Sequence, residues 1–178
     1  KEVSVWLKAK MDMTGNTGKL FPTGLRKDIV NNLEVSLVDA GTLMMLVKAE
    51  SLGLNGSEGA EAFEKGSLLM EKIEDTRKKI AIIAGLGDIS KSVIPKVGIL
   101  SPARIGGTIK SQYLTPFDLH PSHAVTGAIC VASACKAEGT VAFEISGASA
   151  EISSKIIIEH PAGILPIQLE TSGSGDNF

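Results

Sequence analysis

The sequence predicts an α+β domain in which a curved, mostly antiparallel sheet surrounds one buried helix and a second helix covers the sheet. Residues 126–136 are apolar around almost the whole circumference of a helix, and such a helix belongs in a core. Residues 68–84 carry one apolar stripe and a charged opposite face, which is typical of a surface helix. About seven or eight short β-prone segments do not alternate regularly with helices, so a doubly wound sheet is not expected.

Length and composition are those of a packed globular chain. The 178 residues are 43% hydrophobic and 21% charged, which argues against disorder. The net charge is -2 and no basic stripe occurs, so nucleic acid is not an expected partner. No apolar run approaches the roughly 18 residues of a membrane span, and the start KEVSVWLKAK lacks the apolar core of a signal peptide. We therefore expect no membrane association and a cytoplasmic location.

The first half of the chain divides into strands and loops. Alternating apolar and polar residues predict a strand over residues 3–9, and the turn formers of residues 14–24 predict a loop. Residues 33–40 and 43–49 are β-prone and flank Gly41, so two antiparallel strands or one strand with a bulge would both fit. Asp39, at this break, is either a site residue or, more commonly, a turn cap.

The surface helix has clear ends, and short strands are expected after it. Ser67 is placed to cap the helix, and Gly85 is placed to end it. A buried strand is predicted at residues 95–100 and a loop at residues 103–111. Further strands are predicted at residues 140–146, 155–160 and 163–170. Residues 1–170 are assigned to one domain and residues 171–178 to a flexible tail.

The apolar helix offers the first candidate site. Thr126 and Gly127 would begin it, and Gly139 would end it. A helix start of small residues leaves backbone N–H groups free and carries partial positive charge, which suits a carboxylate or phosphate. A core helix with an ordinary threonine cap is the simpler interpretation, and these residues alone favour it. Cys130 and Cys135 lie inside the helix and are predicted to be reduced core residues.

Histidines and one lysine are the remaining chemical candidates. His120 and His123 precede the helix and could hydrogen-bond an anionic substrate, act as acid or base, or simply bond to backbone. His160 could come near them, although no spacing requires it. A metal is not expected, because no third ligand is fixed by the spacing. Lys19 could hold an anion together with the backbone of its glycine-rich loop, or the loop could be a plain turn.

Five stretches, in order along nearly the whole chain, resemble motifs of the 2-methylaconitate cis–trans isomerase family. They are TGNTGKLFPTG, SLVDAGTLMMLVKAESLGL, IPKVGILSP, HPSHAVTGAICVASACKAEGTVA and HPAGILPIQLE. They are similar to the family's T-G-K-L-L-P-T-G, S-L-(V/I)-D-A-G-N-P, (V/I)-P-K-(V/I), H-x-x-x-A-V-T-G-A and H-P-(S/A)-G segments. Relatives in this family include methylitaconate Δ-isomerase and 4-oxalomesaconate tautomerase.

The resemblance implies a diaminopimelate-epimerase-like fold. In that fold two similar domains each wrap a curved sheet around a central helix, and the active site lies between them. The resemblance also implies proton transfer on small unsaturated di- and tricarboxylates, without cofactor or metal. This chain would then be the second domain, and the missing first domain of the same protein would hold the family's acid/base Lys and Cys. The chain alone would bind a small carboxylate substrate without a catalytic residue of its own, and a homo-oligomer remains open.

The resemblance also assigns substrate-binding residues and so favours an anion site over a plain cap. They are His120, Ala124, Val125, Thr126, Gly127, Ala128, Thr42 and Lys19. Ala124 stands where related epimerases have a catalytic Cys. Thr42 replaces the Asn of D-A-G-N-P and lacks the amide's paired donor and acceptor. Two alternatives follow: a non-catalytic or divergent binding domain of the same fold, or a phenazine-biosynthesis-like isomerase with another substrate.

Overall fold

The computed structural model describes residues 16–115, 117–147 and 154–169, and within them one seven-stranded sheet and its helices. The strand predicted at residues 3–9 and the tail predicted at residues 171–178 lie outside these ranges. In chain order the elements are β1 (Asp28–Val30), β2 (Leu33–Ala40), β3 (Thr42–Lys48), the 3-10 helices Glu50–Leu52 and Ala60–Phe63, α1 (Leu68–Ile83), β4 (Lys96–Ser101), β5 (Ile109–Leu114), α2 (Val125–Lys136), α3 (Val141–Ser146), β6 (Lys155–His160) and β7 (Gly163–Gln168).

The sheet is mixed, and its strands are neighbours in chain order from β1 to β7. Four pairs are antiparallel, whereas β3–β4 and β5–β6 are parallel. Each parallel pair needs a long crossover. The first crossover contains α1, and the second contains α2 and α3. The fold is therefore α+β with a mostly antiparallel sheet, as the sequence predicts.

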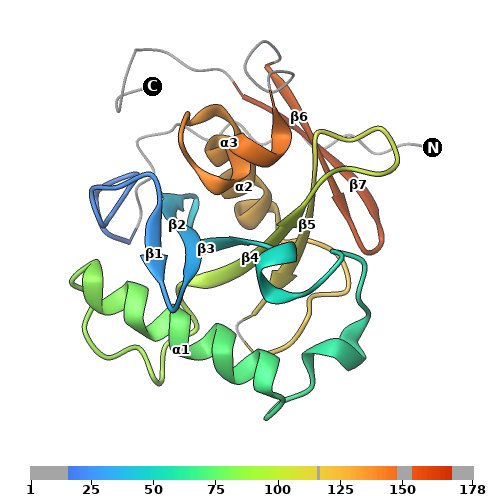
Figure 1. Cartoon of the computed structure of the whole chain (residues 1–178). Helices are drawn as coiled ribbons and strands as arrows, with labels where there is room; N and C mark the ends of the chain where they lie inside the picture. Colours follow the sequence, from blue (N-terminus) through green and yellow to red (C-terminus); the bar gives the residue numbers. More distant parts are fainter. Residues whose placement is uncertain (1–15, 116, 148–153, 170–178) are drawn as a thin grey trace.

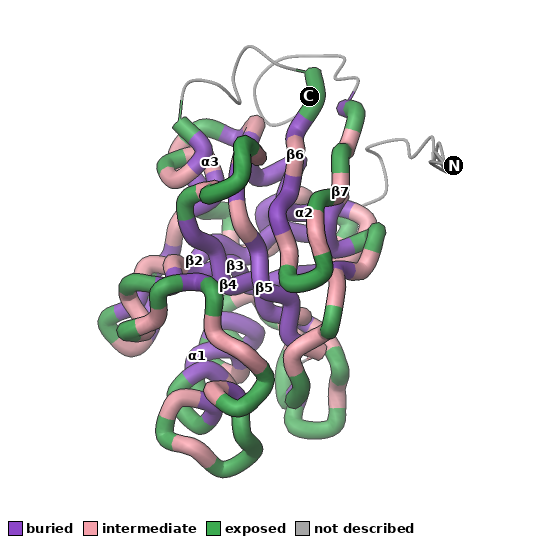
Figure 2. The backbone as a smooth tube through the Cα atoms, turned by 90° about the vertical axis from the view of Figure 1, so that its right-hand side faces the viewer, coloured by how far each residue is buried: buried purple, intermediate pink, exposed green. Residues whose placement is uncertain are grey.

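The helices form a layer on each face of the sheet. α1 lies on one side, and α2 and α3 lie on the other (Figure 1). On β2, Leu37 joins the core beneath α1 whereas Val38 joins the core beneath α2, because successive strand residues point to opposite faces. The central strands are consequently buried along most of their length, as the purple tube in Figure 2 shows.

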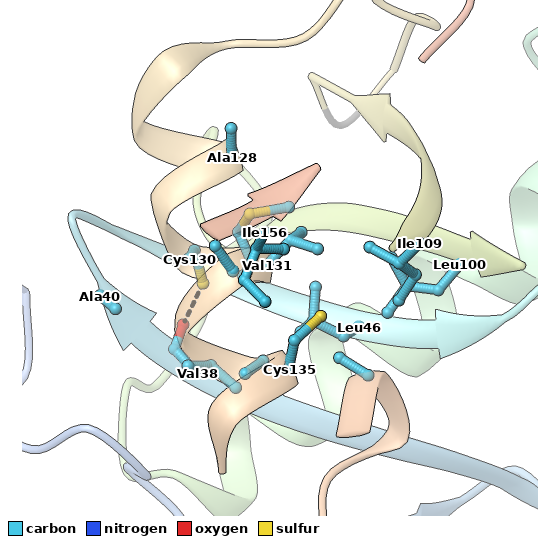
Figure 3. Close-up of a cluster of buried hydrophobic side chains, with 14 of the residues drawn as sticks. Val38, Ala40, Leu46, Leu100, Ile109, Ala128, Cys130, Val131, Cys135 and Ile156 are labelled. Atoms are coloured by element: carbon cyan, nitrogen blue, oxygen red, sulfur yellow. Dashed lines mark hydrogen bonds between the residues drawn. The ribbon is translucent and has the colours of Figure 1, made fainter. Parts of the chain in front are cut away.

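α2 is the apolar helix that the sequence predicts. Its buried residues are Gly127, Ala128, Cys130, Val131, Ala132, Ser133, Ala134 and Cys135. Figure 3 shows Val131 and Cys135 among sheet side chains such as Leu46, and the Cys130 thiol donates to the Val38 carbonyl at 3.4 Å. Burial raises the pKa of both thiols to about 12, so they stay protonated at neutral pH. Both cysteines are free core residues, as predicted.

Both ends of α2 differ from the prediction. The helix begins at Val125, with Ala124 as its extended N-cap residue, so Thr126 lies inside the first turn and caps nothing. At the other end the C-cap residue is Ala137, and the prediction that Gly139 caps this helix is wrong. The Thr140 hydroxyl donates to the Ala134 carbonyl at 2.7 Å, which satisfies one terminal acceptor that a glycine motif would otherwise serve.

The strand predicted at residues 140–146 is instead the helix α3. Thr140 is its N-cap, and the threonine hydroxyl accepts from the N–H of Phe143 at 3.1 Å. The N–H of Val141 donates to the Ser36 hydroxyl on β2 at 3.0 Å. A short apolar run does not distinguish helix from strand, and here capping and a tertiary hydrogen bond decide for helix.

The loop predicted at residues 103–111 ends earlier, because β5 begins at Ile109. The strand alternates, and Ser111 and Tyr113 share the face of Ile109, toward α2. The two β-prone runs around Gly41 are two antiparallel strands rather than one bulged strand. Gly41 has a φ of 74°, a conformation that this tight turn requires and that glycine adopts at low cost.

α1 has the predicted N-cap and contains one residue that the pattern does not reveal. Ser67 accepts from the N–H of Met70 at 3.3 Å. Arg77 is fully buried, and its guanidinium binds the Glu74 carboxylate through two N–H···O contacts of 2.7 and 2.9 Å. Arg77 also donates to the Pro95 carbonyl at 3.3 Å, and so joins the helix to the chain just before β4.

Two buried carboxylates fasten loops to the sheet. Asp39 of β2 accepts from the backbone N–H groups of Asn16 and Thr17 at 3.1 and 2.7 Å, so it caps a turn, one of the two roles expected for it. Glu159 of β6 accepts from the N–H groups of Arg104, Ile105 and Gly107, at 2.7, 2.7 and 2.8 Å.

Glu159 is expected to make the stability of the folded domain depend on pH. Burial raises its pKa, but the three N–H groups and nearby Lys110 outweigh burial and hold the pKa below the ordinary value. The ionised form is therefore favoured in the folded state, so its contribution is present above the unfolded pKa of about 4.3 and is lost as pH falls through the folded pKa. We expect the melting temperature of Glu159→Gln to lie below that of wild type at neutral pH and to converge with it in acid. Thermal denaturation at a series of pH values measures both proteins. A difference in melting temperature that stays constant across the pH series would contradict this expectation.

Candidate functional site

The first turn of α2 presents unpaired backbone donors. Within the described residues, the N–H groups of Val125, Thr126 and Gly127 have no hydrogen-bond acceptor, as expected for the first three residues of a helix. The N–H of Ala128, predicted to be free, donates to the Ala124 carbonyl at 2.9 Å. Val125 and Thr126 are exposed, so this positive end of the helix dipole is open to an anion.

The β2–β3 turn lies against this helix start. A Cβ atom on Gly41 would sit 3.4 Å from the Thr126 carbonyl oxygen, which places the turn in contact with the first turn of α2. Thr42, the next residue, is partly exposed beside it. Lys19 is exposed on the loop that Asp39 fastens, and its backbone exchanges hydrogen bonds with the Thr17 hydroxyl of the same loop. The structure therefore places the turn that carries Thr42 against the first turn of α2, whereas Lys19 lies on another loop.

Gly127 permits two rings to approach the helix. A Cβ at this position would lie 2.5 Å from Cε2 and 2.9 Å from Cδ2 of Tyr113, and 3.2 Å from Cε1 of His123. The first two distances are shorter than non-bonded carbon atoms allow. Tyr113 and His123 pack with ring centroids 5.1 Å apart. The glycine that the resemblance assigns to substrate binding thus also has a packing role.

His123 is a buried, neutral residue that holds the helix start. Its Nε2 lies 3.0 Å from the Ser111 hydroxyl, and its Nδ1 lies 3.0 Å from the Ala124 carbonyl. A carbonyl only accepts, so Nδ1 carries the proton and the Ser111 hydroxyl donates to Nε2. The pKa of His123 is lowered to about 4, chiefly by burial; the hydrogen bond to the Ala124 carbonyl opposes this shift, and the charges of His160 and His120 add to it. With both nitrogens engaged, His123 has a structural role.

His120 and His160 share one local geometry. Each precedes a proline, and Nδ1 of each ring accepts a backbone N–H two residues on, from Ser122 at 3.0 Å and from Ala162 at 3.2 Å. The proton of the neutral ring is therefore on Nε2. His160 lies near His123, with ring centroids 6.5 Å apart, so the structure brings together all three histidines. Burial lowers the pKa of His160, which favours the neutral form at physiological pH.

The arrangement suits an anion better than a cation. The unpaired N–H groups of the first turn of α2 are all donors, and His120, whose Nε2–H is a further donor, lies on the loop before this helix with its ring packed against Tyr113. In the described ranges no group of three or more His, Cys, Asp or Glu residues is placed to hold a metal ion. No described helix is long and apolar enough to cross a membrane.

Tyr113 and Ser111 are the residues that sequence reasoning missed, although the alternation in IKSQYL was a signal for their strand.

The fold is that of a solved isomerase. A crystal structure of methylitaconate-delta-isomerase superposes with a TM-score of 0.77, at 23% sequence identity, over 86% of this chain and 45% of that chain. At this identity the likeness shows the fold alone.

The chain belongs to the PrpF protein family, whose model matches residues 3–177. It is 36% identical over 159 residues to 4-oxalomesaconate tautomerase of Pseudomonas putida, an alignment that covers 89% of this chain and 44% of the relative. It is 32% identical over 166 residues to (4E)-oxalomesaconate Delta-isomerase of Novosphingobium sp., covering 93% and 46%. The chain thus spans a little under half the length of these curated relatives.

Proposed function

We propose that this chain is part of a cofactor-independent isomerase of small unsaturated di- or tricarboxylates of the 2-methylaconitate kind, with a diaminopimelate-epimerase-like fold. Its contribution is a site for one substrate carboxylate at the N-terminus of α2. The observation that carries the proposal is the set of unpaired N–H groups at Val125, Thr126 and Gly127. Family membership and the names of the relatives support the reaction class.

The site would stabilise negative charge on the substrate and would not itself transfer the proton. When a proton leaves the carbon next to a carboxylate, negative charge spreads onto the carboxylate oxygens. Fixed N–H donors at a helix start stabilise that charge without having to reorient. Three groups of this chain are poor proton carriers, because both thiols have a pKa of about 12 and His123 is buried and neutral. In line with the family resemblance, we assign the acid and base to the rest of the protein.

The full-length protein tests the reaction class. Incubated in D2O with 4-oxalomesaconate or 2-methylaconitate, it should shift a double bond or interconvert cis and trans isomers and incorporate solvent deuterium at the carbon that exchanges its proton. NMR of the substrate follows both events. Absence of isomerisation and of deuterium incorporation with every unsaturated di- and tricarboxylate tried would refute the proposal.

One substitution removes a donor with little other change. Val125→Pro deletes the first N–H of α2, which has no intrahelical acceptor, and proline is well tolerated at this position. Ala124 already has φ -72° and ψ 137°, the extended conformation that a residue before proline prefers. We expect the Kd for trans-aconitate, measured by calorimetry on the full-length protein, to rise about tenfold with little change in melting temperature.

Val125→Ala is the matched control, because it shortens the same exposed side chain and keeps the N–H. It reports what the side chain alone contributes. If the proline variant binds trans-aconitate as tightly as the alanine variant, the helix-start role is wrong.

A further inference from the structure

The Tyr113 hydroxyl has no role in the fold or in the proposed carboxylate site as defined by the backbone N–H groups. The residue is 3% exposed and lies on β5, near the end of the strand. Its hydroxyl has no hydrogen-bond partner among the described residues. It is not one of the fully buried polar atoms that lack a partner, so the oxygen itself keeps some access to solvent. A phenol of this kind normally finds a partner when the ring is buried. The described residues supply no acceptor, which leaves this role to solvent, to a ligand or to other parts of the protein.

The ring is held so that its hydroxyl end lies beside the first turn of α2. Of the two ring carbons near Gly127, Cε2, which is next to the hydroxyl-bearing carbon, is the closer to the Cβ position. The His120 ring stands nearly perpendicular to the Tyr113 ring, at 86° with centroids 5.8 Å apart. The His123 ring packs against it at 5.1 Å. Contacts with Gly127, His120 and His123 thus fix the ring within the proposed carboxylate site.

We propose that Tyr113 is a substrate-contacting residue, whose hydroxyl donates a hydrogen bond to the carboxylate held by the N–H groups of Val125, Thr126 and Gly127. This inference rests on the proposed function and adds a specificity-determining side chain to it. A phenol donor supplements the backbone donors, and a hydrogen bond to a charged acceptor is stronger than one between neutral groups.

Protonation agrees with a donor role. Burial raises the pKa of Tyr113, and the neighbouring Cys130 raises it further. The phenol therefore keeps its proton at neutral pH, where an ionised phenol would repel a carboxylate.

Tyr113→Phe tests the inference in the full-length protein, because it removes the hydroxyl and keeps the packed ring. We expect the Kd for trans-aconitate to rise about tenfold and kcat/KM to fall similarly. We expect the melting temperature to stay that of wild type, since the hydroxyl has no hydrogen-bond partner to lose among the described residues. Phe117→Leu, which alters an exposed aromatic residue outside the site, is the control for handling and stability.

NMR separates this inference from the proposed function. Tyr113 is the single tyrosine of this chain, and in full-length protein labelled with 13C at the tyrosine Cζ its signal is the one that disappears in Tyr113→Phe. On addition of trans-aconitate, that signal should shift together with the amide signals of Val125, Thr126 and Gly127. Amide shifts without a tyrosine shift, and with wild-type affinity in Tyr113→Phe, would overturn the inference and leave the proposed function standing. If no signal responds, both fall. A lower melting temperature of Tyr113→Phe than of wild type would show that the hydroxyl has a structural role and would also overturn the inference.

Discussion

Glu74→Gln is expected to lower the free energy of unfolding by about 3 kcal/mol. Arg77 is fully buried, and Glu74 supplies the carboxylate that faces its Nε and Nη2. Breaking a buried pair by removing one partner leaves an uncompensated charge away from water, which costs far more than losing a surface pair. The pKa of nearby Lys96 is lowered by burial and by the positive charge of Arg77, so a second cation already opposes the guanidinium there. The glutamine amide oxygen and the Pro95 carbonyl could still accept hydrogen bonds from Arg77, but neither carries the charge that compensates the guanidinium.

Asp75→Asn is the matched control, because it neutralises the next residue of the same helix. Asp75 pairs with Lys79 at 2.7 Å, but both side chains are about half exposed, at 55% and 51%. Water screens this pair, so its removal should cost much less stability than the removal of the Glu74 carboxylate. Urea unfolding at neutral pH measures both variants. Equal losses would mean that burial of Arg77 does not govern the pair.

Gly127→Ala is expected to destabilise the domain by about 2 kcal/mol, although alanine is the better helix former. Helix propensity alone would favour the alanine by about 1 kcal/mol. The new Cβ, however, would meet the Tyr113 ring at 2.5 Å, and that ring is packed against His120 and His123. Either the ring or the helix must move, and overpacking of this kind costs about 1–3 kcal/mol. The same movement would displace the N–H groups of the first turn.

A double-mutant cycle isolates the contact. In a Tyr113→Leu background, the Gly127→Ala substitution should cost at least about 1 kcal/mol less than in wild type, because the ring carbons are gone. Thr126→Ala, in the same turn but exposed, should change stability by no more than about 0.5 kcal/mol. Equal costs of Gly127→Ala in both backgrounds would place the strain elsewhere.

The sequence predicts those elements whose signal is local. β2, β3, α1 and α2 follow from period, caps and glycine, and their bounds agree within a few residues. The prediction of a strand in place of α3 is wrong because its six residues are too few to show a helical period. The hydrogen bond that favours the helix is made to Ser36, which is distant in sequence. β5 is absent from the prediction because the polar residues Lys110 and Gln112 obscure an alternation that only the sheet makes clear.

Some features of the candidate site could be predicted from the sequence, and others could not. The first turn of α2 could be assigned from its small residues and from the family motif, although its donors begin at Val125 and exclude Ala128. The contact between Tyr113 and Gly127 could not be foreseen, since it depends on how a strand and a helix meet across the core. The roles of His120 and His123 likewise depend on which ring nitrogen faces which backbone group.

The order of strands in the sheet has a consequence for how the chain folds. Every strand pairs with its neighbour in sequence, so the antiparallel pairs can form as local hairpins with little loss of chain entropy. The entropic cost of closing long loops is confined to β3–β4 and β5–β6, which are joined through α1 and through α2 with α3. Tyr113 and the first turn of α2 both precede β6 along the chain, so the proposed carboxylate site can form within one continuous segment, before the β5–β6 pair closes the sheet.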